Sequence, residues 1–224
     1  MSANEPDLII LAAGHSLGAD GVIKSLIKHP KTKKNIIETA KYYFPNFNVR
    51  IVIGYRALEI VSAHPELSYV VNDEWSFTGN SHSLALALRN RKTLVVSGDL
   101  FVSQEMVKIL DEKPNRSIAF TARSERRRGN AINFKVDEQE RILSHYTGKM
   151  ETVTDPESLG AFWIGDADIA KQWKRGCEES PNKFAAECLP FDSGFIYSRE
   201  IPSDTLYEIT DAKDFLSFSK RQSL

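Results

Sequence analysis

Short apolar runs alternate with amphipathic stretches over the first half of the chain. Five runs are continuous and rich in β-forming residues, which is typical of strands buried on both faces, and they lie at 8–11, 49–53, 68–71, 93–96 and 117–122. Apolar residues at helical spacing fill the stretches between them, at 36–44, 57–63, 81–88 and 103–110. Pro45 ends the first of these helices, and Ser103 is the expected N-cap of the last. Alternation of this kind predicts a mostly parallel sheet with helices on both faces.

The second half of the chain has a different pattern. A polar turn at 137–140 between 131–136 and 141–145 predicts a β-hairpin. Further elements are expected as a strand at 159–164 and helices at 169–177, 181–188 and 212–220, the last with Asp211 as its N-cap. We therefore expect a single α/β domain of three layers, residues 1–224, in which a small β-hairpin and helical insertion lies over the rim of the sheet.

Composition narrows the class of protein. Hydrophobic residues make up 42% of the 224 residues, enough for a sizeable core, and the net charge of −1 argues against a dedicated nucleic-acid binder. Cys177 and Cys188 lack metal-ligand spacing and are expected to be reduced structural thiols. The apolar run at 8–13 is too short for a signal peptide or a membrane span, so we expect a cytoplasmic protein without a membrane partner.

Candidate chemistry gathers at the ends of the predicted strands. Gly14, Gly54 and Asp99 each follow a strand, and ligands of parallel α/β sheets bind beyond the carboxyl ends of the strands. Residues 11–14 lead into a glycine-containing loop whose backbone N–H groups can approach a phosphate. Lys24, at the end of that loop, can place a charge on phosphate oxygens. Such turns are common in α/β proteins and most lysines are solvated, so the loop alone leaves both interpretations open.

Two further segments allow a functional and a structural interpretation. Asp99 can hold a divalent cation at the end of its strand, or it can cap the turn that follows. The polar segment 72–84 carries Asn80 and Ser83, which can bind a base or a ribose, whereas capping of the next helix is the alternative.

Basic and aromatic residues add candidates of the same kind. Arg123, Arg126, Arg127 and Arg128 follow the fifth strand and can clamp a phosphate, or they can form a solvated basic loop. Three tryptophans can form an aromatic wall for a quaternary ammonium group or pack in the core, and these are Trp75, Trp163 and Trp173. His15 and His82 also lie on candidate ligand loops, but lone histidines are not evidence for proton transfer.

These segments together resemble one family. The motifs that carry the resemblance are Leu-Ala-Ala-Gly at 11–14, Lys-Ser-Leu-Ile at 24–27, Val-Ile-Gly-Tyr at 52–55, Asn72, Asn80 with Ser83 and Leu84, and Gly98 with Asp99. The chain resembles the nucleotidyltransferases of the sugar-phosphate and choline-phosphate type. It is most similar to the phosphocholine cytidylyltransferase branch and to a related branch that activates phosphorylated amino compounds, such as phosphoglutamine, for capsule or phosphonate pathways. The resemblance covers residues 8–122 and returns at 207–215.

The resemblance implies a fold and an activity. It implies a three-layer GT-A or Rossmann-like nucleotidyltransferase, with a nucleotide-binding core at 1–122, an acceptor-side insertion at 123–206 and a C-terminal helix at 207–224. The implied reaction is Mg²⁺-dependent transfer of CMP from CTP to a small phosphorylated acceptor, with release of pyrophosphate.

The resemblance also assigns roles to residues. Lys24 and Asp99 are the implied catalytic residues, Asp99 and Asp211 the implied Mg²⁺ ligands, and Arg126 and Arg128 the implied acceptor-binding residues. The implied nucleotide-binding residues are Leu11, Ala12, Ala13, Gly14, Asn80, Ser83 and Gly98.

The sequence departs from the family pattern at three points. The family's first loop commonly reads Gly-x-Gly-x-Arg, whereas residues 14–18 read Gly-His-Ser-Leu-Gly; the substitutes that the sequence offers are Lys24, Lys28, Arg126, Arg127 and Arg128. Gly79 stands where the first Asn of the Asn-Asn pair is expected. Thr210 stands where an Asp is common, so the second metal ligand is Asp211, Asp214 or absent.

Three alternatives remain from the sequence. The nearest is a sugar-1-phosphate nucleotidylyltransferase with another nucleotide. The second is a non-catalytic nucleotide-binding module on the same fold, and the third is a nucleotide-sugar glycosyltransferase. The sequence leaves open the acceptor, the pathway and whether the chain forms a homodimer.

Overall fold

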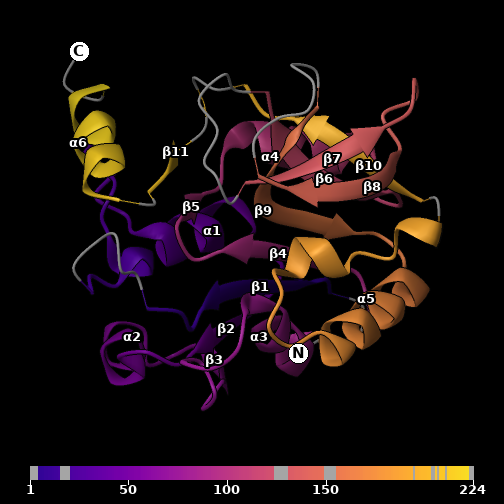
Figure 1. Ribbon diagram of the computed structural model, residues 1–224. Helices are drawn as coiled ribbons and strands as arrows, with labels where there is room; N and C mark the ends of the chain where they lie inside the picture. The colour runs from indigo at the N-terminus through magenta and orange to yellow at the C-terminus, as the bar shows by residue number, and fades with distance from the viewer. Residues whose placement is uncertain are drawn as a thin grey trace.

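The structure is a computed structural model that describes residues 5–15, 21–123, 131–148, 155–193, 195–202, 205, 207–209 and 211–221. Within these residues nine strands form one sheet, which runs through the centre of the molecule (Figure 1). Its main path has the order β10-β6-β9-β4-β1-β2-β3, and the hairpin β7–β8 joins it at β9. The strands are β1 (Asp7–Ala12), β2 (Asn48–Ile53), β3 (Ser68–Val71), β4 (Thr93–Ser97), β6 (Ser117–Ala122), β7 (Ile132–Val136), β8 (Ile142–Thr147), β9 (Glu157–Ile164) and β10 (Ile196–Glu200).

The pairing of the strands is mostly parallel. β1 pairs in parallel with both β2 and β4, β2 with β3, and β6 with β10. β9 is the exception, because it lies antiparallel between β4 and β6. This corrects one expectation: part of segment 123–206 is not an insertion over the rim, since it supplies β9 and β10 to the main sheet itself.

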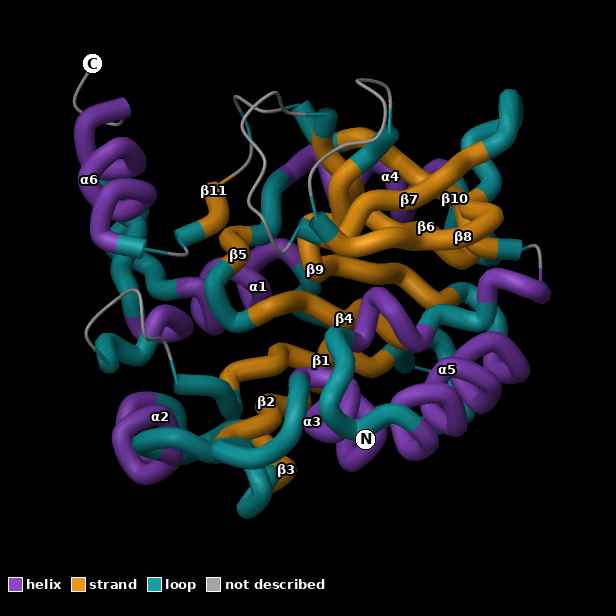
Figure 2. Tube along the Cα trace, in the orientation of Figure 1, coloured by secondary structure: helices purple, strands orange, loops and turns teal. Residues whose placement is uncertain are grey.

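Helices cover both faces of the sheet, so the predicted three-layer fold is confirmed. One face packs against α1 (Ile36–Tyr43), α2 (Ala57–Ala63) and α4 (Gln104–Glu112). The other packs against α3 (Asn80–Ala87), α5 (Ala167–Glu179) and the 3-10 turn η3 (Ala185–Cys188). In the view of Figures 1 and 2, α1 and α4 lie behind the sheet and α5 lies in front of it. Alternate residues of each central strand point to opposite faces, so Ile9 belongs to one core and Leu8 and Ile10 to the other.

Side-chain caps mark where α1 and α5 begin. A capping box joins Asn35 and Glu38 at α1, and Asp166 accepts the N–H groups of Asp168 and Ile169 at α5. Ser103 is the N-cap of α4, as expected, although its side chain makes no capping hydrogen bond and its hydroxyl has no partner in the described part of the chain.

One expectation was wrong: residues 181–188 were expected to form a helix, whereas only η3 is helical there. The residues before η3 form a turn in which Lys183 N–H donates to the carbonyl of Ser180 at 3.2 Å, and this turn hydrogen bonds to the start of α3, where Gly79 N–H donates to the carbonyl of Pro181 at 2.8 Å. A tertiary contact therefore replaces the helix that local spacing predicted.

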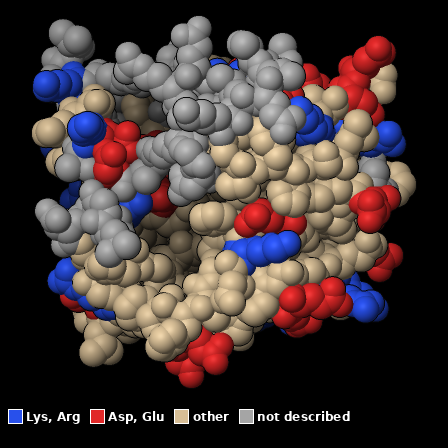
Figure 3. All heavy atoms as spheres, in the orientation of Figure 1, with Lys and Arg blue, Asp and Glu red and all other residues tan. Residues whose placement is uncertain are grey.

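A small second sheet brings the C-terminal segment to the end of β4. β5 (Leu100–Phe101) pairs antiparallel with β11 (Tyr207–Glu208), and the N–H of Ile209 donates to the carbonyl of Asp99 at 2.8 Å. The final helix, α6 (Ala212–Arg221), follows directly. The surface is hollowed beside this end of the sheet, where β1 and β4 stop (Figure 3).

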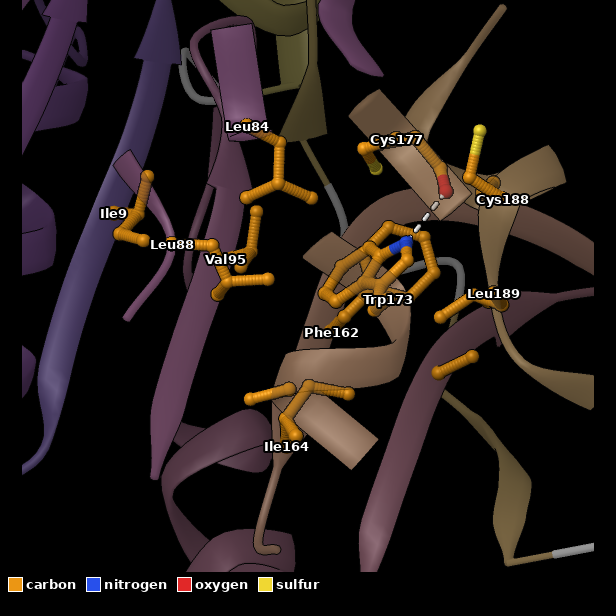
Figure 4. Close-up of a cluster of buried hydrophobic side chains, with 14 of the residues drawn as sticks. Ile9, Leu84, Leu88, Val95, Phe162, Ile164, Trp173, Cys177, Cys188 and Leu189 are labelled. Carbon is orange, nitrogen blue, oxygen red and sulfur yellow. Dashed lines mark hydrogen bonds between the residues drawn. The ribbon is translucent and has the colours of Figure 1, made fainter. Parts of the chain in front are cut away.

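The core beneath α5 is built around Trp173. Its ring is fully buried, packs edge-on against Phe162 at a centroid distance of 5.2 Å, and donates its indole N–H to the carbonyl of Ala185 at 2.8 Å (Figure 4). Cys177 and Cys188 lie in the same cluster as free, buried thiols. The hydrogen bond that the Cys177 thiol donates to Cys188, together with burial, raises the pKa of Cys177 far above its usual range, as expected for a structural cysteine.

Asp7, the first residue of β1, is a buried carboxylate at the opposite end of the sheet from the hollow. It has no exposed surface, and neither carboxylate oxygen accepts a hydrogen bond within the described residues. The guanidinium nitrogens of Arg91 and Arg89 lie 3.8 and 3.9 Å away. Burial raises the pKa of Asp7, and the neighbouring arginines only partly oppose this shift.

We predict that Asp7→Asn increases the free energy of unfolding at pH 7. A raised pKa means that the folded state favours the neutral carboxyl, so its stabilising contribution is complete below the ordinary Asp pKa and is lost as the pH rises through the folded value. The advantage of the variant should therefore shrink as the pH approaches 4 or below, where the wild-type carboxyl is also neutral. Urea unfolding of both proteins across this range measures it, and a variant that is less stable at pH 7 contradicts the prediction.

Candidate functional site

Three strand ends meet at one rim, as the sequence predicted. Because β1, β2 and β4 are parallel neighbours, their carboxyl ends lie at the same edge of the sheet. Backbone hydrogen bonds continue past the strands: Gly98 N–H donates to the carbonyl of Leu11 at 2.9 Å, and Tyr55 N–H to that of Ala13 at 2.9 Å. These bonds fix the turns that carry Gly54 and Asp99 against the end of β1.

Two glycines permit this close approach. A Cβ at Gly98 would lie 2.7 Å from the carbonyl oxygen of Leu11, and one at Gly54 would lie 2.8 Å from that of Ala13. Gly14 differs, because a Cβ there would meet nothing within 4 Å. Gly54 and Gly98 are therefore required by packing, whereas Gly14 faces open space at the rim.

Lys24 and Asp99 form an ion pair at this rim. Lys24 lies in η2 (Lys24–Leu26), and its Nζ is 3.1 Å from Oδ2 of Asp99, with 15% and 20% of the two side chains exposed. The hydroxyl of Ser97 donates a short hydrogen bond to Oδ1 of the same carboxylate. Both charges are thus held in place and partly shielded from water, which strengthens their interaction with any charged ligand.

Two adjoining cavities open on either side of this pair. The first, called here the lysine cavity, has a volume of about 290 Å³. The second, called the carboxylate cavity, has about 260 Å³. Their common wall is formed by Leu11, Asn80, Ser97, Asp99 and Phe184.

The lysine cavity lies over the end of β1. Its further lining includes Ala12, Gly14, His15, Lys24, Tyr55 and Gly98. His15 meets Tyr55 edge-on at a ring-centroid distance of 4.4 Å, and Tyr55 in turn packs against Trp75 at 5.2 Å. Among the described residues, this cavity combines backbone of the first strand end, the ammonium group of Lys24 and the three aromatic rings of His15, Tyr55 and Phe184.

The carboxylate cavity has the opposite charge. Besides Asp99 it is lined by Glu157 and Glu208, and its apolar wall contains Ala131, Ile132, Leu159, Phe162, Ala185 and Ala186. Among the described residues that line it, none is a lysine or an arginine. The described lining of this cavity thus combines three carboxylates with an apolar wall.

Most of the predicted nucleotide-binding residues line these cavities. Leu11 and Asn80 line both, and Ala12, Gly14 and Gly98 line the lysine cavity. Two do not. Ala13 is buried in the core, and Ser83 is 3% exposed with its hydroxyl accepting a hydrogen bond from Nδ2 of Asn72 at 2.9 Å. Ser83 thus helps to hold the first turn of α3 against Asn72.

Asp211 has a structural role instead of lining the site. Its Oδ1 accepts the N–H groups of Lys213 and Asp214 at 2.8 and 2.9 Å, which caps α6 as the sequence predicted. Asp211 lines neither cavity, whereas Glu208, three residues earlier, lines the carboxylate cavity with Asp99. No cluster of three or more His, Cys, Asp or Glu side chains is found in the described ranges. Two carboxylates nevertheless fit Mg²⁺, which takes one or two from the protein and the rest from substrate phosphates and water.

The structure tests only part of the arginine and tryptophan hypotheses. Arg126, Arg127 and Arg128 lie outside the described residues. Arg123 forms ion pairs with Glu140 and Glu200 at 3.1 and 2.6 Å. Trp163 and Trp173 are buried in the core, so they do not form an aromatic wall.

Sequence reasoning missed several lining residues. Glu208 stands in the late Glu-Ile segment that supports the family resemblance, so its position could have been weighed against Asp211. Glu157 and Phe184 carry no such signal, because only the packing of distant segments brings them to the rim. Among the described helices, none is both long and apolar enough to cross a membrane.

Solved structures of other proteins share the fold of this chain. Over 96% of its length the chain superposes on 98% of the CTP:phosphocholine cytidylyltransferase from Streptococcus pneumoniae, with a TM-score of 0.76 and 18% identity. The inositol-1-phosphate CTP transferase from T. maritima gives 0.71 at 15% identity, covering 99% of this chain and 97% of that one. A UDP-glucose pyrophosphorylase in complex with UDP-glucose gives 0.74 at 13% identity, covering 98% of both chains.

The chain has the nucleotidyltransferase fold. No protein-family model matches the sequence, and no curated protein sequence matches it. The similar structures named above are all nucleotidyltransferases, which agrees with the resemblance found in the sequence. At 13–18% identity the comparison shows the fold alone.

We predict that Gly98→Ala lowers the free energy of unfolding by about 1–3 kcal/mol, the usual effect of forcing an extra methyl group into a packed site. The new Cβ would lie 2.7 Å from the carbonyl of Leu11 and separate the ends of β1 and β4. Gly14→Ala is the matched control, because its Cβ meets open space. Urea unfolding of the two variants compares them, and equal stability contradicts the packing argument.

Proposed function

We propose that this protein is a Mg²⁺-dependent cytidylyltransferase that transfers CMP from CTP to a small phosphorylated amino compound and releases pyrophosphate. The observation that carries the proposal is the Lys24–Asp99 ion pair, which lies where two cavities of different charge adjoin. A group-transfer enzyme of this kind must bring two anionic substrates together and offset the charge that develops between them.

The lysine cavity is the proposed nucleotide site. Backbone groups of residues 11–14 line the end of β1, and the rings of His15 and Tyr55 offer aromatic faces to a base. Lys24 supplies the positive charge for the triphosphate, in place of the Arg that the first loop lacks. CTP is the proposed nucleotide because two of the similar structures are named for CTP, one as a phosphocholine cytidylyltransferase and one as an inositol-1-phosphate CTP transferase.

The carboxylate cavity is the proposed acceptor site. Its described carboxylates and apolar wall suit an amino or alkylammonium group, with the acceptor phosphate directed across the common wall toward Lys24 in the lysine cavity. Asp99 and Glu208 are the residues that would hold Mg²⁺. When bound there, the ion would neutralise part of the charge on the triphosphate.

The proposed reaction is a single displacement. An oxygen of the acceptor phosphate attacks the α-phosphorus of CTP, the bond from that phosphorus to the bridging oxygen breaks, and pyrophosphate leaves with the electron pair. A phosphate monoester is already an anion at pH 7, so the site needs no strong general base. Lys24 offsets the charge on the transferred group, and the partly buried wall excludes water around it.

We predict that Lys24→Ala and Asp99→Asn each lower turnover by roughly 10²-fold or more, the typical loss when one preorganised electrostatic contact is removed. Lys108→Ala and Asp111→Asn are matched controls, because both side chains are exposed on α4 away from the two cavities. Pyrophosphate release under saturating substrates measures all four variants. Near wild-type turnover in either site variant overturns the assignment of that residue.

A panel assay tests the substrate pair. Pyrophosphate release is measured with CTP, UTP, GTP and dTTP against phosphocholine, a phosphorylated amino acid and a sugar 1-phosphate, with and without Mg²⁺. The proposal predicts the highest rate for CTP with an amino acceptor, and none in EDTA. The similarity to a UDP-glucose pyrophosphorylase favours a sugar-1-phosphate nucleotidylyltransferase as the second candidate, which a preference for UTP or dTTP with the sugar phosphate would establish. Tight nucleotide binding without turnover would instead indicate a non-catalytic module.

A further inference from the structure

A segment from the second half of the chain lies across the beginning of α3. We call residues 180–185 the strap. Two backbone N–H groups of α3's first turn donate to it, Gly79 to Pro181 at 2.8 Å and Ser81 to Lys183 at 3.3 Å. The Ser81 hydroxyl donates to the carbonyl of Ser180 at 2.7 Å, and Ala185 N–H donates to Oδ1 of Asn80 at 2.6 Å. Both ends of the strap are therefore fixed to α3.

Gly79 makes this close packing possible. A Cβ at this position would lie 2.2 Å from the carbonyl oxygen of Lys183 and 2.9 Å from the carbonyl carbon of Asn182. The φ of Gly79 is −80°, so the requirement for glycine comes from the neighbouring backbone and not from a left-handed conformation. The departure from the family's Asn-Asn pair at this position thus coincides with the place where the strap contacts α3.

The strap holds Phe184 at the common wall of the two cavities. Its N–H donates to Oε2 of Glu187 at 2.8 Å, and the next residue, Ala185, accepts the indole N–H of the buried Trp173. The backbone around Phe184 is therefore anchored to the core, yet its side chain lines both cavities and the residue is 43% exposed. The exposed part of this ring is apolar, and a ligand bound in either cavity would cover part of it and remove it from water.

We propose that Phe184 is a specificity-determining residue that contacts both the nucleotide and the acceptor and couples their binding. An occupant of either cavity covers part of the ring and orders it, so the second occupant meets a contact surface that is already in place. Coupling between two ligands is reciprocal, so each substrate raises the affinity for the other by the same factor. This inference rests on the proposed function, because it takes the two cavities as the two substrate sites.

Kinetics of Phe184→Ala test the inference. KM for CTP and KM for the most active acceptor of the panel should each rise by about tenfold, equal to ~1.4 kcal/mol, while kcat changes by less than about threefold. Phe184→Tyr keeps the ring and should retain wild-type constants. Phe77→Ala is the matched control, since Phe77 is 84% exposed, lies just before α3 and lines neither cavity. An increase in only one KM, or in neither, overturns the coupling role.

Gly79→Ala tests the strap without changing a residue that faces the substrates. The added methyl group must displace the Lys183 carbonyl, so the same rise in both KM values is expected in a protein that still unfolds cooperatively. A cooperatively folded Gly79→Ala with wild-type KM values shows that the strap does not position Phe184, and overturns the inference.

Titration calorimetry with CTP separates this inference from the proposed function. The wild type should bind CTP without turnover in the absence of acceptor, and Phe184→Ala should bind it about tenfold more weakly. A wild type that turns over while Phe184→Ala matches it in every constant overturns the role of Phe184 and leaves the cytidylyltransferase proposal standing. A wild type that neither binds CTP nor releases pyrophosphate overturns both.

Discussion

The parallel register of β1 between β2 and β4 is the constraint on which the rest of the site depends. It brings the ends of three strands to one edge, and the bonds from Gly98 to Leu11 and from Tyr55 to Ala13 extend that register into the loops. Asp99 follows β4 by two residues, so its position is set by the sheet rather than by a flexible turn. Lys24 reaches it from η2, and their 3.1 Å contact joins the first loop to the end of β4.

The two cavities at this edge differ in the charged side chains that line them. Lys24 lines one cavity, and Glu157 and Glu208 line the other, while Asp99 belongs to the wall between them. A ligand with a polyanionic end and a ligand with a cationic end would each have a preferred side. Their phosphates would then meet at the ion pair, where partial burial makes each fixed charge count for more than it does in water.

Local sequence patterns predicted the elements whose apolar spacing is visible within the segment itself. The strands at 68–71 and 117–122 and the helix at 57–63 have the boundaries that the apolar runs predicted. Asp211 shows the limit of such patterns, because an Asp before a helix suits both a cap and a metal ligand, and only the structure shows that it caps α6. The rule for parallel strand ends placed Asp99 at the same rim as the first loop, and Lys24 stands at the end of that loop.

The features that escaped prediction depend on contacts between distant segments. The antiparallel entry of β9 between β4 and β6 joins residues far apart in the chain, and no local period encodes it. The strap begins as a turn that hydrogen bonds to α3, in place of the helix that the spacing of 181–188 predicted. Phe184 reaches both cavities only through that contact, so its place could not be read from its neighbours in the sequence.

A crystal of the protein soaked with CTP and Mg²⁺ would show directly where the nucleotide binds. We expect the base and ribose over the end of β1 in the lysine cavity, the triphosphate against Lys24, and a metal ion held by Asp99. The open side of the α-phosphate should then face the carboxylate cavity. Nucleotide bound at any other part of the molecule, or a triphosphate that contacts neither Lys24 nor a metal on Asp99, would contradict this expectation.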